Sequence, residues 1–421
     1  MLQISQIREN PEKIIASLAV KNFDATAIIK KVLALDAQKR ILQKKADDTQ
    51  FEANKLSEEI GLLYKSGKTQ EANLLKENTT QLKVDIKNIN DELNQIQIDL
   101  DKLLVSMPNT PHESVPRGKS PEDNEIIYTE GSLERDPKML PHWELTSKYD
   151  IIDFELGNKI TGAGFPVYKG KGARLQRALI NFFIEKGIEA GYTEIQPPLF
   201  VNEASAYGTG QLPDKDSQMY FVQLDNFYLI PTAEVPVTNI YRDVILKAAD
   251  LPVKNVAYSS CFRREAGSYG KDVRGLNRLH QFDKVEIVQL QLPENSYATL
   301  EAMKEHVCNL IRLLGLPFRV LRLCGGDMSF TSALTYDMEV YSKGQEKWLE
   351  VSSVSNFETF QSNRMKIRYK DESGKSKLVH TLNGSALALP RIVAALLENN
   401  QTENGIAIPE CLRPYTGFDF I

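Results

Sequence analysis

Apolar residues recur at alternating spacings of three and four through most of the first hundred residues. One run covers residues 32–63 and a second covers 72–103, and residues 65–68 between them form the only turn-like stretch of this region. Such a repeat places apolar side chains along one face of a helix, and two helices pair through that face. The pattern therefore predicts an antiparallel coiled-coil hairpin over about 27–104.

The two runs also suggest which residues of the hairpin face each other. If Leu63 opposes Ala72, then Ala46 opposes Ile89. Small residues of the first helix would then meet large residues of the second, which allows the helices to approach closely. Each helix would contain about 35 residues and extend for about 50 Å, so we expect the hairpin to project into solvent.

The end of the hairpin is marked by the stretch MPNTPHESVP. Its closely spaced prolines cannot continue a helix, so a domain boundary is expected here. We predict a first domain over residues 1–105, which includes a short helix within residues 1–22. A linker over 106–120 and a second domain over 121–421 follow.

The second domain has a mixed pattern. Helical stretches at 173–189 and 297–314 alternate with β-type runs at 256–262 and 282–292. No GxxxxGK[ST] motif is present and no GxGxxG motif follows a strand, so neither a P-loop nor a Rossmann nucleotide site is supported. Any ATP must be bound by a different arrangement.

Composition narrows the class of protein. The chain has 421 residues, 25% of them charged and 42% hydrophobic, as in an ordinary globular protein. No apolar run approaches the ~20 residues of a membrane span, and the first residues do not resemble a secretory signal. We expect a cytoplasmic protein without membrane contact. The four cysteines lack metal-ligand spacing, which favours reduced thiols over a zinc site.

The net charge of −5 does not suggest a nucleic-acid binder, so any RNA contact must come from local patches. The arm contains 13 Lys or Arg and 13 Asp or Glu over residues 27–104, but its basic residues are unevenly placed. From these residues alone, a solvated coiled-coil face or a dimerisation element is favoured over RNA binding. The basic cluster, in which Asp36 is the single acidic residue, comprises Lys30, Lys31, Lys39, Arg40, Lys44 and Lys45.

The segment richest in candidate chemistry reads FRREAGSYGKDVRGLNRLHQFDKVE. Two β-type stretches around a Gly-rich loop predict a long antiparallel hairpin. Residues two apart in a strand share a face, so Arg263 and Glu265 are expected to point the same way, and Arg278, Phe282 and Glu286 share a parity. Guanidinium groups suit phosphates and carboxylates, and an aromatic ring can stack on a purine. A solvated hairpin held by salt bridges is the alternative.

This segment is similar to motif 2 of class II aminoacyl-tRNA synthetases, in the form carried by seryl-tRNA synthetases. GYTEIQPPLFVNEASAYGTGQLP resembles the dimer-forming motif 1, with Pro198 as its signature proline, and YLIPTAEVPVTN carries a Thr-Ala-Glu loop. LEVSSVSNFETFQSNR and TLNGSALALPRIVAALLE resemble the region before motif 3 and motif 3 itself. PHESVP and the C-terminal IAIPECLRPYTG also fit, so the resemblance covers nearly the full length.

The resemblance implies an α+β fold, in which an antiparallel β-sheet catalytic domain is flanked by helices and preceded by the coiled-coil hairpin. It also implies a homodimer whose arm reaches across to tRNA(Ser), and to selenocysteine tRNA in organisms that have one. This changes the interpretation of the arm to RNA contact, tracking tRNA shape and backbone. The candidate tRNA contacts are Lys39, Arg40, Lys44, Lys45, Lys271 and Arg274.

The resemblance further implies that serine is activated with ATP. Arg263 would bind both the α-phosphate and the serine carboxylate, and Arg391 would clamp the γ-phosphate side of a bent ATP. Glu265 would accept from the adenine amino group, and Phe282 would stack on the ring. The expected ATP site comprises Arg263, Arg264, Glu265, Arg278, Phe282, Glu350, Val351, Ser352, Ser353 and Arg391.

Glu350 and Ser353 resemble the ligands that hold Mg²⁺ against the phosphates. A regular strand would place them on opposite faces, so we expect a bulge or turn there. For Asn383 and Ser385 taken alone, a helix N-cap is the commoner explanation. The expected serine pocket comprises Thr232, Ala233, Glu234, Arg263, Glu286, Asn383 and Ser385.

The competing interpretations are a class II relative that charges a carrier protein, an inactive RNA-binding protein, and a synthetase for threonine or proline. The long arm disfavours the first. The presence of Arg263, Glu286, Glu350 and Arg391 disfavours the second, and the serine-type Thr-Ala-Glu loop and the lack of a Cys/His set disfavour the third. No dedicated general base is expected.

Overall fold

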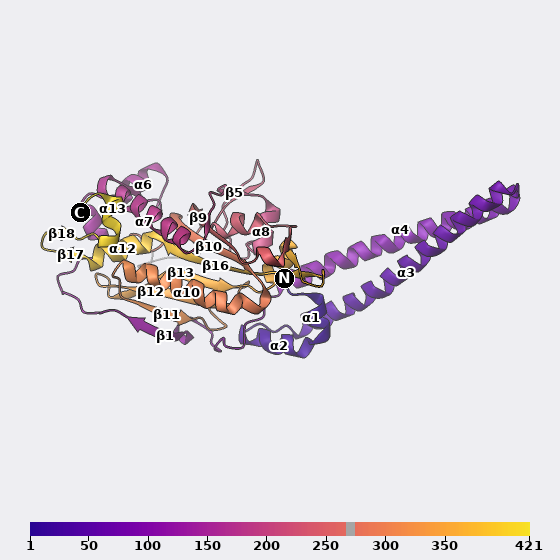
Figure 1. The fold of residues 1–421 in the computed structure, drawn as a ribbon, viewed down its shortest axis with the longest axis horizontal. Coiled ribbons are helices and arrows are strands. Elements are labelled where there is room, and N and C mark those ends of the chain that lie inside the picture. The colour runs from indigo at the N-terminus through magenta and orange to yellow at the C-terminus, as the bar shows by residue number, and fades with distance from the viewer. Residues whose placement is uncertain (267–273) are drawn as a thin grey trace. The chain divides into compact units, whose positions relative to one another are not determined.

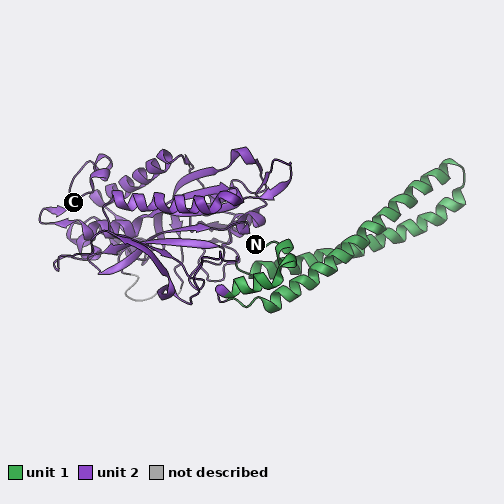
Figure 2. Cartoon of the chain, turned by 60° about the horizontal axis from the view of Figure 1, so that its bottom comes forward, with its two compact units in different colours: residues 1–19, 23–108 green, residues 20–22, 109–421 purple. Residues whose placement is uncertain are grey.

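The computed structural model describes residues 1–266 and 274–421. The chain forms two compact units, one of residues 1–19 and 23–108 and the other of residues 20–22 and 109–421; Figure 2 shows them in different colours. Across the described ranges, no helix combines the length and the apolar character that crossing a membrane requires.

The first unit is a helical hairpin with two short helices at its start. Helices α1 (Ile4–Glu9) and α2 (Pro11–Val20) precede α3 (Thr26–Lys65) and α4 (Thr69–Ser106), which contain 40 and 38 residues. The predicted hairpin is confirmed, and Figure 1 shows α3 and α4 running side by side. Gly67 joins them with a φ of +77°, which glycine adopts without strain.

The register of the hairpin agrees with the expected facing residues. Ala46, Ile89 and Leu93 form one buried cluster between the helices. Nearer the base, the Nε and Nη2 of Arg8 donate to the carboxylate of Asp36 at 2.8 and 3.0 Å. This fork ties α1 to α3 and lowers the pKa of the Asp36 carboxyl.

The second unit is built on a large sheet, with eight strands among the described residues in the order β1-β11-β12-β13-β16-β10-β9-β4. Neighbouring strands are antiparallel, except that β4 pairs with β9 in parallel. The strands are β1 (Glu125–Glu130), β4 (Thr193–Glu194), β9 (Val253–Phe262), β10 (Gln281–Gln291), β11 (Phe318–Arg322), β12 (Leu334–Ser342), β13 (Lys347–Asn356) and β16 (His380–Ala388).

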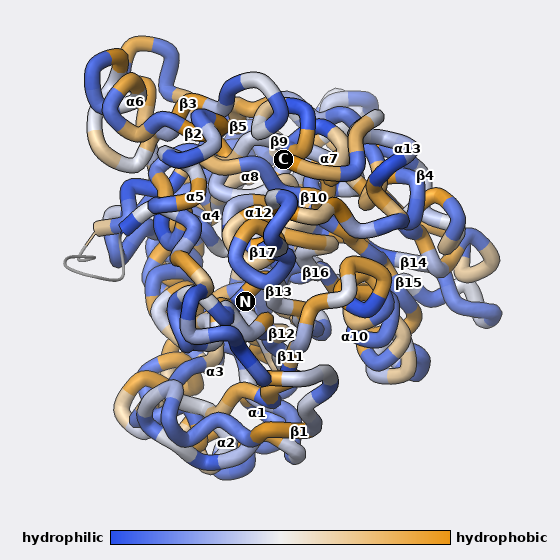
Figure 3. The backbone as a smooth tube through the Cα atoms, turned by 90° about the vertical axis from the view of Figure 1, so that its left-hand side faces the viewer, coloured by the Kyte–Doolittle hydropathy of each residue, from blue (hydrophilic) through white to orange (hydrophobic). Residues whose placement is uncertain are grey.

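Helices cover the sheet and bury its apolar side chains. Helix α7 (Gly170–Glu189) packs against β9 and β10, α10 (Ser296–Leu313) against β13 and β16, and α12 (Leu389–Asn399) against β10, β12 and β13. Figure 3 shows hydrophobic stretches in interior strands such as β10 and β16. This sheet with flanking helices, preceded by a helical hairpin, confirms the predicted α+β fold.

Shorter elements complete the second unit. They are α5 (His142–Lys148), β2 (Ile152–Asp153), α6 (Phe154–Ile160), β3 (Val167–Tyr168), β5 (Phe200–Val201), α8 (Glu203–Thr209), β6 (Phe221–Val222), β7 (Phe227–Leu229), α9 (Glu234–Asn239), β8 (Ile245–Lys247), α11 (Phe360–Met365), β14 (Arg368–Lys370), β15 (Ser376–Leu378), β17 (Gln401–Thr402), β18 (Gly405–Ile406) and α13 (Arg413–Thr416).

Candidate active site

A pocket of about 570 Å³ in the second unit collects side chains from segments that are far apart in the sequence. They come from the ends of β9 and β10, from the turn before α9, from β13 and β16, and from the first turn of α12. The predicted residues that line it are Thr232, Glu234, Arg263, Glu265, Arg278, Phe282, Glu286, Glu350, Val351, Ser352, Ser353, Asn383, Ser385 and Arg391.

The strands of the hairpin that carries the motif 2 residues agree with the predicted β-type runs, but they do not include Arg263, Glu265 or Arg278. Strand β9 ends at Phe262 and β10 begins at Gln281, so the prediction that Arg263 and Glu265 lie on one strand face is wrong. Glu265 has a φ of +48°, which turns the backbone out of the extended path. Arg278 likewise precedes its strand. All three residues nevertheless line the pocket.

Two arginines and an aromatic ring define one side of the pocket. The guanidinium of Arg263 lies 5.3 Å from the centroid of the Phe282 ring, and its Nε donates to the carbonyl of Pro231 at 3.3 Å. The Nη1 of Arg278 lies 3.1 Å from the Glu265 carboxylate. Two cations and a planar ring in one concave surface suit a nucleotide, whose phosphates and base need those two kinds of contact.

The deep end of the pocket is acidic. Glu286 is 2% exposed and forms an ion pair with the buried Lys284. The hydroxyl of Thr232 donates to the Glu286 carboxylate at 3.2 Å and accepts from the Nζ of Lys284 at 2.9 Å. These contacts hold Glu286 in place with an acceptor directed at the pocket.

Glu234, the first residue of α9, is the second buried carboxyl group here. Its Oε1 accepts from the amide of Gln361 at 2.6 Å. Burial, reinforced by the negative charge of Glu286, raises the pKa of Glu234 to about 7. A small cation such as an ammonium group would relieve this unfavourable charge.

Asn383 and Ser385 lie within β16, opposite Val288 and Glu286 of β10, and therefore do not cap a helix. The Nδ2 of Asn383 is buried and makes no hydrogen bond of good geometry among the described residues, although it lies close enough to Glu234 to act against the rise in the pKa of that carboxyl. A buried donor without a partner is costly. This group is therefore a candidate to bind a ligand oxygen.

The expected bulge at Glu350 and Ser353 is confirmed. The register of β12 against β13 shifts between Met338 and Glu339, which pair with Ser352 and Glu350. One extra residue on β13 reverses the side-chain alternation. Glu350 and Ser353 consequently line the same pocket.

A further carboxyl group stands beside this bulge. Asp337 pairs with Ser353 across the sheet, and its buried Oδ1 has no hydrogen-bond partner in the described ranges. Burial, and then the charge of Glu350, raises the pKa of Asp337 well above its ordinary value. The Glu350 carboxylate and the Ser353 hydroxyl, which line the pocket, are oxygen donors of the kind that Mg²⁺ prefers.

Arg391 occupies the first turn of α12. Its Nε donates to the backbone carbonyl of Asn277 at 3.0 Å, and its Nη1 donates to the carbonyl of Glu350 at 2.7 Å. These contacts join the motif 2 loop to β13 and keep the guanidinium at the pocket wall.

Other predicted residues lie elsewhere. Arg264 lies over the Tyr220 ring at 5.8 Å, and Arg274 lies over Trp143 at 4.6 Å. Neither lines the pocket, nor does Ala233, which is buried just before α9. Lys271 falls outside the described residues.

The arm residues differ in their surroundings. Lys39 contacts Gln97 across the hairpin, and Arg40 lies 3.2 Å from Asp36. Lys44 and Lys45 are exposed. Of the four predicted contacts, this last pair projects most freely into solvent.

Lys284 and Gln361 hold the two pocket carboxylates and were not predicted. A signal for Lys284 existed, because it lies two residues before Glu286 and therefore shares its strand face. Gln361, on α11, lies 127 residues from Glu234 in the sequence. No local pattern could have connected them.

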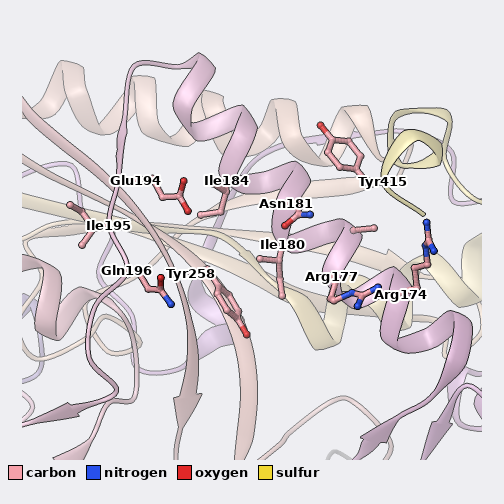
Figure 4. Close-up of a pocket in the computed structure, with 11 residues that line it drawn as sticks. Arg174, Arg177, Ile180, Asn181, Ile184, Glu194, Ile195, Gln196, Tyr258 and Tyr415 are labelled. Atoms are coloured by element: carbon pink, nitrogen blue, oxygen red, sulfur yellow. The ribbon is translucent and has the colours of Figure 1, made fainter. Parts of the chain in front are cut away.

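A second cavity, of about 630 Å³, lies along α7 and the edge strand β4. Figure 4 shows Arg174 and Arg177 of α7 and Tyr258 of β9 around it. Gln196 also lines this cavity, and it lies two residues before Pro198, which is exposed. No predicted ATP or serine residue lines this cavity.

Two family profiles match the chain. Residues 1–111 match the seryl-tRNA synthetase N-terminal domain, and residues 220–400 match the tRNA synthetase class II core domain (G, H, P, S and T).

Within the described ranges, no group of three or more His, Cys, Asp or Glu side chains could hold a metal ion by itself.

Similar proteins cover the whole chain. Serine–tRNA ligase of Salinibacter ruber is 51% identical, over 99% of this chain and 98% of its own length. The crystal structure of seryl-tRNA synthetase from Pyrococcus horikoshii complexed with ATP has a TM-score of 0.92 at 33% identity, covering 100% of this chain and 99% of that one. Cytoplasmic serine–tRNA ligase from Naegleria fowleri in complex with AMP has a TM-score of 0.88 at 29% identity, covering 100% and 98%. The chain therefore belongs to the seryl-tRNA synthetase family, with a class II synthetase core.

Proposed function

We propose that this protein is a serine–tRNA ligase, which activates L-serine with ATP and transfers the seryl group to tRNA(Ser). The single observation that supports this most strongly is the pocket itself. It combines three arginines and an aromatic ring with a small acidic end that has hydrogen-bonding groups for a hydroxyl. The serine carboxylate attacks the ATP α-phosphate and pyrophosphate leaves. A ribose hydroxyl of the terminal adenosine of tRNA then attacks the carbonyl of seryl-adenylate, which forms the ester and releases AMP.

In this proposal Arg263 contacts both reacting groups, because its fork can neutralise the serine carboxylate and the α-phosphate together. Arg391 binds the far phosphates. The base stacks on Phe282, and Glu265 accepts from its amino group once Arg278 turns to the nucleotide. The remaining lining residues of the phosphate side, Val351 and Ser352, shape the wall.

The acidic end binds serine. Glu234 in its ionised form accepts from the ammonium group, Glu286 and Thr232 complete the set of acceptors, and Asn383 and Ser385 contact the hydroxyl. A pocket built to hydrogen-bond a hydroxyl rejects alanine strongly, because alanine leaves buried polar groups unpaired.

Glu350 and Ser353 would hold Mg²⁺, with phosphate oxygens as further ligands. When bound, the ion supplies positive charge that stabilises the charge developing on the phosphates. Arg391 supplies further positive charge from the protein itself. Arg391 is fixed to the carbonyl of Glu350, so the metal ligand and the phosphate clamp move as one unit.

We assign residues 1–105 to a tRNA-binding domain, 106–120 to a linker and 121–421 to the catalytic domain. The protein is proposed to be a cytoplasmic homodimer that binds tRNA across its two subunits. The edge strand β4, the cavity beside α7 and Pro198 would face the partner. The unpaired edge and the open cavity support this, since an exposed strand edge is a ready template for association.

The test is ATP–pyrophosphate exchange with a panel of amino acids. Exchange should depend on serine, with alanine at least ~10³-fold less effective in kcat/KM. Charging of total tRNA with labelled serine should follow the same preference. Exchange driven by threonine or proline, or none with serine, would contradict the proposal.

A further inference from the structure

Beneath the pocket lies a buried pair that the reaction above does not use. His142, the first residue of α5, and Glu398, near the end of α12, are both 0% exposed. The Nδ1 of His142 lies 2.6 Å from the Oε1 of Glu398, and the backbone N–H of His142 donates to the same oxygen at 2.8 Å.

The contacts of the His142 ring define its protonation. Its Nε2 accepts from the backbone N–H of Leu276 at 2.8 Å, so this nitrogen carries no proton. The proton of the neutral ring is then on Nδ1 and is donated to Glu398. The ring therefore links a helix carboxylate to the backbone of the motif 2 loop.

The loop lies directly on this ring. Gly275 has a φ of +67°, and a Cβ on it would be 2.1 Å from the Nε2 of His142. No side chain other than hydrogen fits there. Gly275 and Leu276 consequently lie against α5, and Arg278, two residues further on, lines the pocket.

A second connection starts at the same carboxylate. Glu398 also accepts from the Nε2 of Gln345 at 2.9 Å and from the hydroxyl of Ser342. The Oε1 of Gln345 accepts from the Nδ2 of Asn277 at 2.9 Å. The backbone carbonyl of Asn277 in turn accepts from Arg391, so the network leads back to the phosphate clamp.

Glu398 and Arg391 belong to one helix, two turns apart. Near the start of α12, Arg391 contacts the motif 2 loop through the carbonyl of Asn277. Near the end of α12, Glu398 is linked to the same loop through His142 and Gln345. A buried network of hydrogen bonds of this kind restricts the side chains of His142, Glu398 and Gln345 to one arrangement.

We propose that His142 and Glu398 are positioning residues for ATP, which hold the returning limb of the motif 2 loop so that Arg278 and Arg391 face the phosphates. This inference rests on the proposed function. It predicts a specific loss of ATP binding when the contact to Leu276 is removed, with serine binding largely kept.

Two substitutions of His142 separate its contacts. His142→Asn keeps a donor at the position of Nδ1 and loses the acceptor for Leu276. His142→Gln keeps an acceptor near Nε2 and loses the donor to Glu398. We expect H142N to raise the KM for ATP about tenfold, while the KM for serine changes by no more than about twofold. H142Q should raise the KM for ATP much less than H142N does.

A binding measurement accompanies the kinetics. In a Trp348→Phe background Trp143 is the remaining tryptophan, and its ring contacts Arg274 of the same limb. ATP titrated against Trp143 fluorescence should show the same shift in Kd. His306→Asn is the matched control, since His306 is a largely buried histidine of α10 that does not line the pocket.

If H142N does not fold, Gln345→Ala tests the second connection, and a smaller rise in the KM for ATP is expected. Unchanged ATP binding in the folded variants, or equal losses for ATP and serine, would overturn the inference. A wild-type protein without serine-dependent exchange would instead contradict the proposed function, so the two failures are distinguishable.

Discussion

Glu234 and Glu286 lie in one pocket, and within the described residues only Glu286 forms an ion pair with a lysine, Lys284. The unequal partners make the two carboxyl groups different. Glu286 is paired with a buried cation, whereas burial and the neighbouring charge raise the pKa of Glu234 to about 7. Serine binding should therefore depend on the ionisation of Glu234.

This predicts how the KM for serine varies with pH. Below about pH 7 Glu234 is protonated in the free enzyme and cannot accept from the ammonium group, so the KM should rise by up to ~10-fold per pH unit. The KM for ATP, measured over pH 5.5–8 in the same exchange assay, serves as the control. A serine KM that stays flat over this range would rule out the assignment.

The same shift affects stability. Because the folded pKa lies above the ordinary value of 4.5, the folded state binds more protons than the unfolded state between these values. The stability of the substrate-free protein should fall as pH rises from about 4.5 to 7. Glu234→Gln removes the titrating group, so its Tm relative to wild type should be higher at pH 8 than at pH 5. If the Tm difference between Glu234→Gln and wild type is the same at pH 5 and pH 8, the raised pKa of Glu234 is contradicted.

Arg263 should be indispensable for activation. Arg263→Ala removes the fork that aligns the two reacting groups, and exchange should fall by at least ~10²–10³-fold. Arg264→Ala is the matched control, because the neighbouring guanidinium lies on Tyr220 outside the pocket. Comparable losses in both variants would contradict the assignment.

Shortening the arm should separate activation from charging. Leu42 and Leu93 contact the same cluster, so residues 43–92 can be replaced with a short Gly-Ser turn that joins them. The Arg8–Asp36 fork is kept. Serine-dependent exchange should stay near the wild-type rate while tRNA charging is lost. Parallel loss of both would mean that the arm supports the catalytic unit instead.

The exposed lysines of the arm are tested within the intact hairpin. Lys44→Ala with Lys45→Ala should weaken tRNA binding and reduce the salt dependence of log Kd by about one unit for each phosphate contact removed. Lys76→Ala with Lys87→Ala, on the other helix, is the charge-matched control. The prediction fails if both pairs have the same effect.

Removing the Glu350 carboxylate should weaken the metal site. Glu350→Gln is expected to raise the Mg²⁺ concentration for half-maximal exchange at least ~10-fold. The affinity for Mn²⁺ in the presence of ATP, followed by electron paramagnetic resonance, measures the same site directly. Glu339→Gln is the control, because Glu339 pairs with Arg319 and does not line the pocket.

Much of the fold was determined by local pattern. The three-four repeat fixes which faces of two helices are apolar, so the hairpin, its turn at Gly67 and the pairing of Ala46 with Ile89 could all be predicted. The shared role that the family resemblance implies for Glu350 and Ser353, three residues apart, predicted a bulge. The motif strings identified the pocket residues because those side chains cluster within short segments.

The tertiary structure decided what depends on distant segments. Beyond β9 the backbone leaves the extended path, with a φ of +48° at Glu265, so the shared strand face expected for Arg263 and Glu265 is absent. The pKa of Glu234 and the contacts of Gln361 arise between residues far apart in sequence. The same is true of His142 and Glu398, 256 residues apart. Hydrogen bonds and electrostatic effects of this kind act through space, and only the packing of the sheet and its helices brings their partners together.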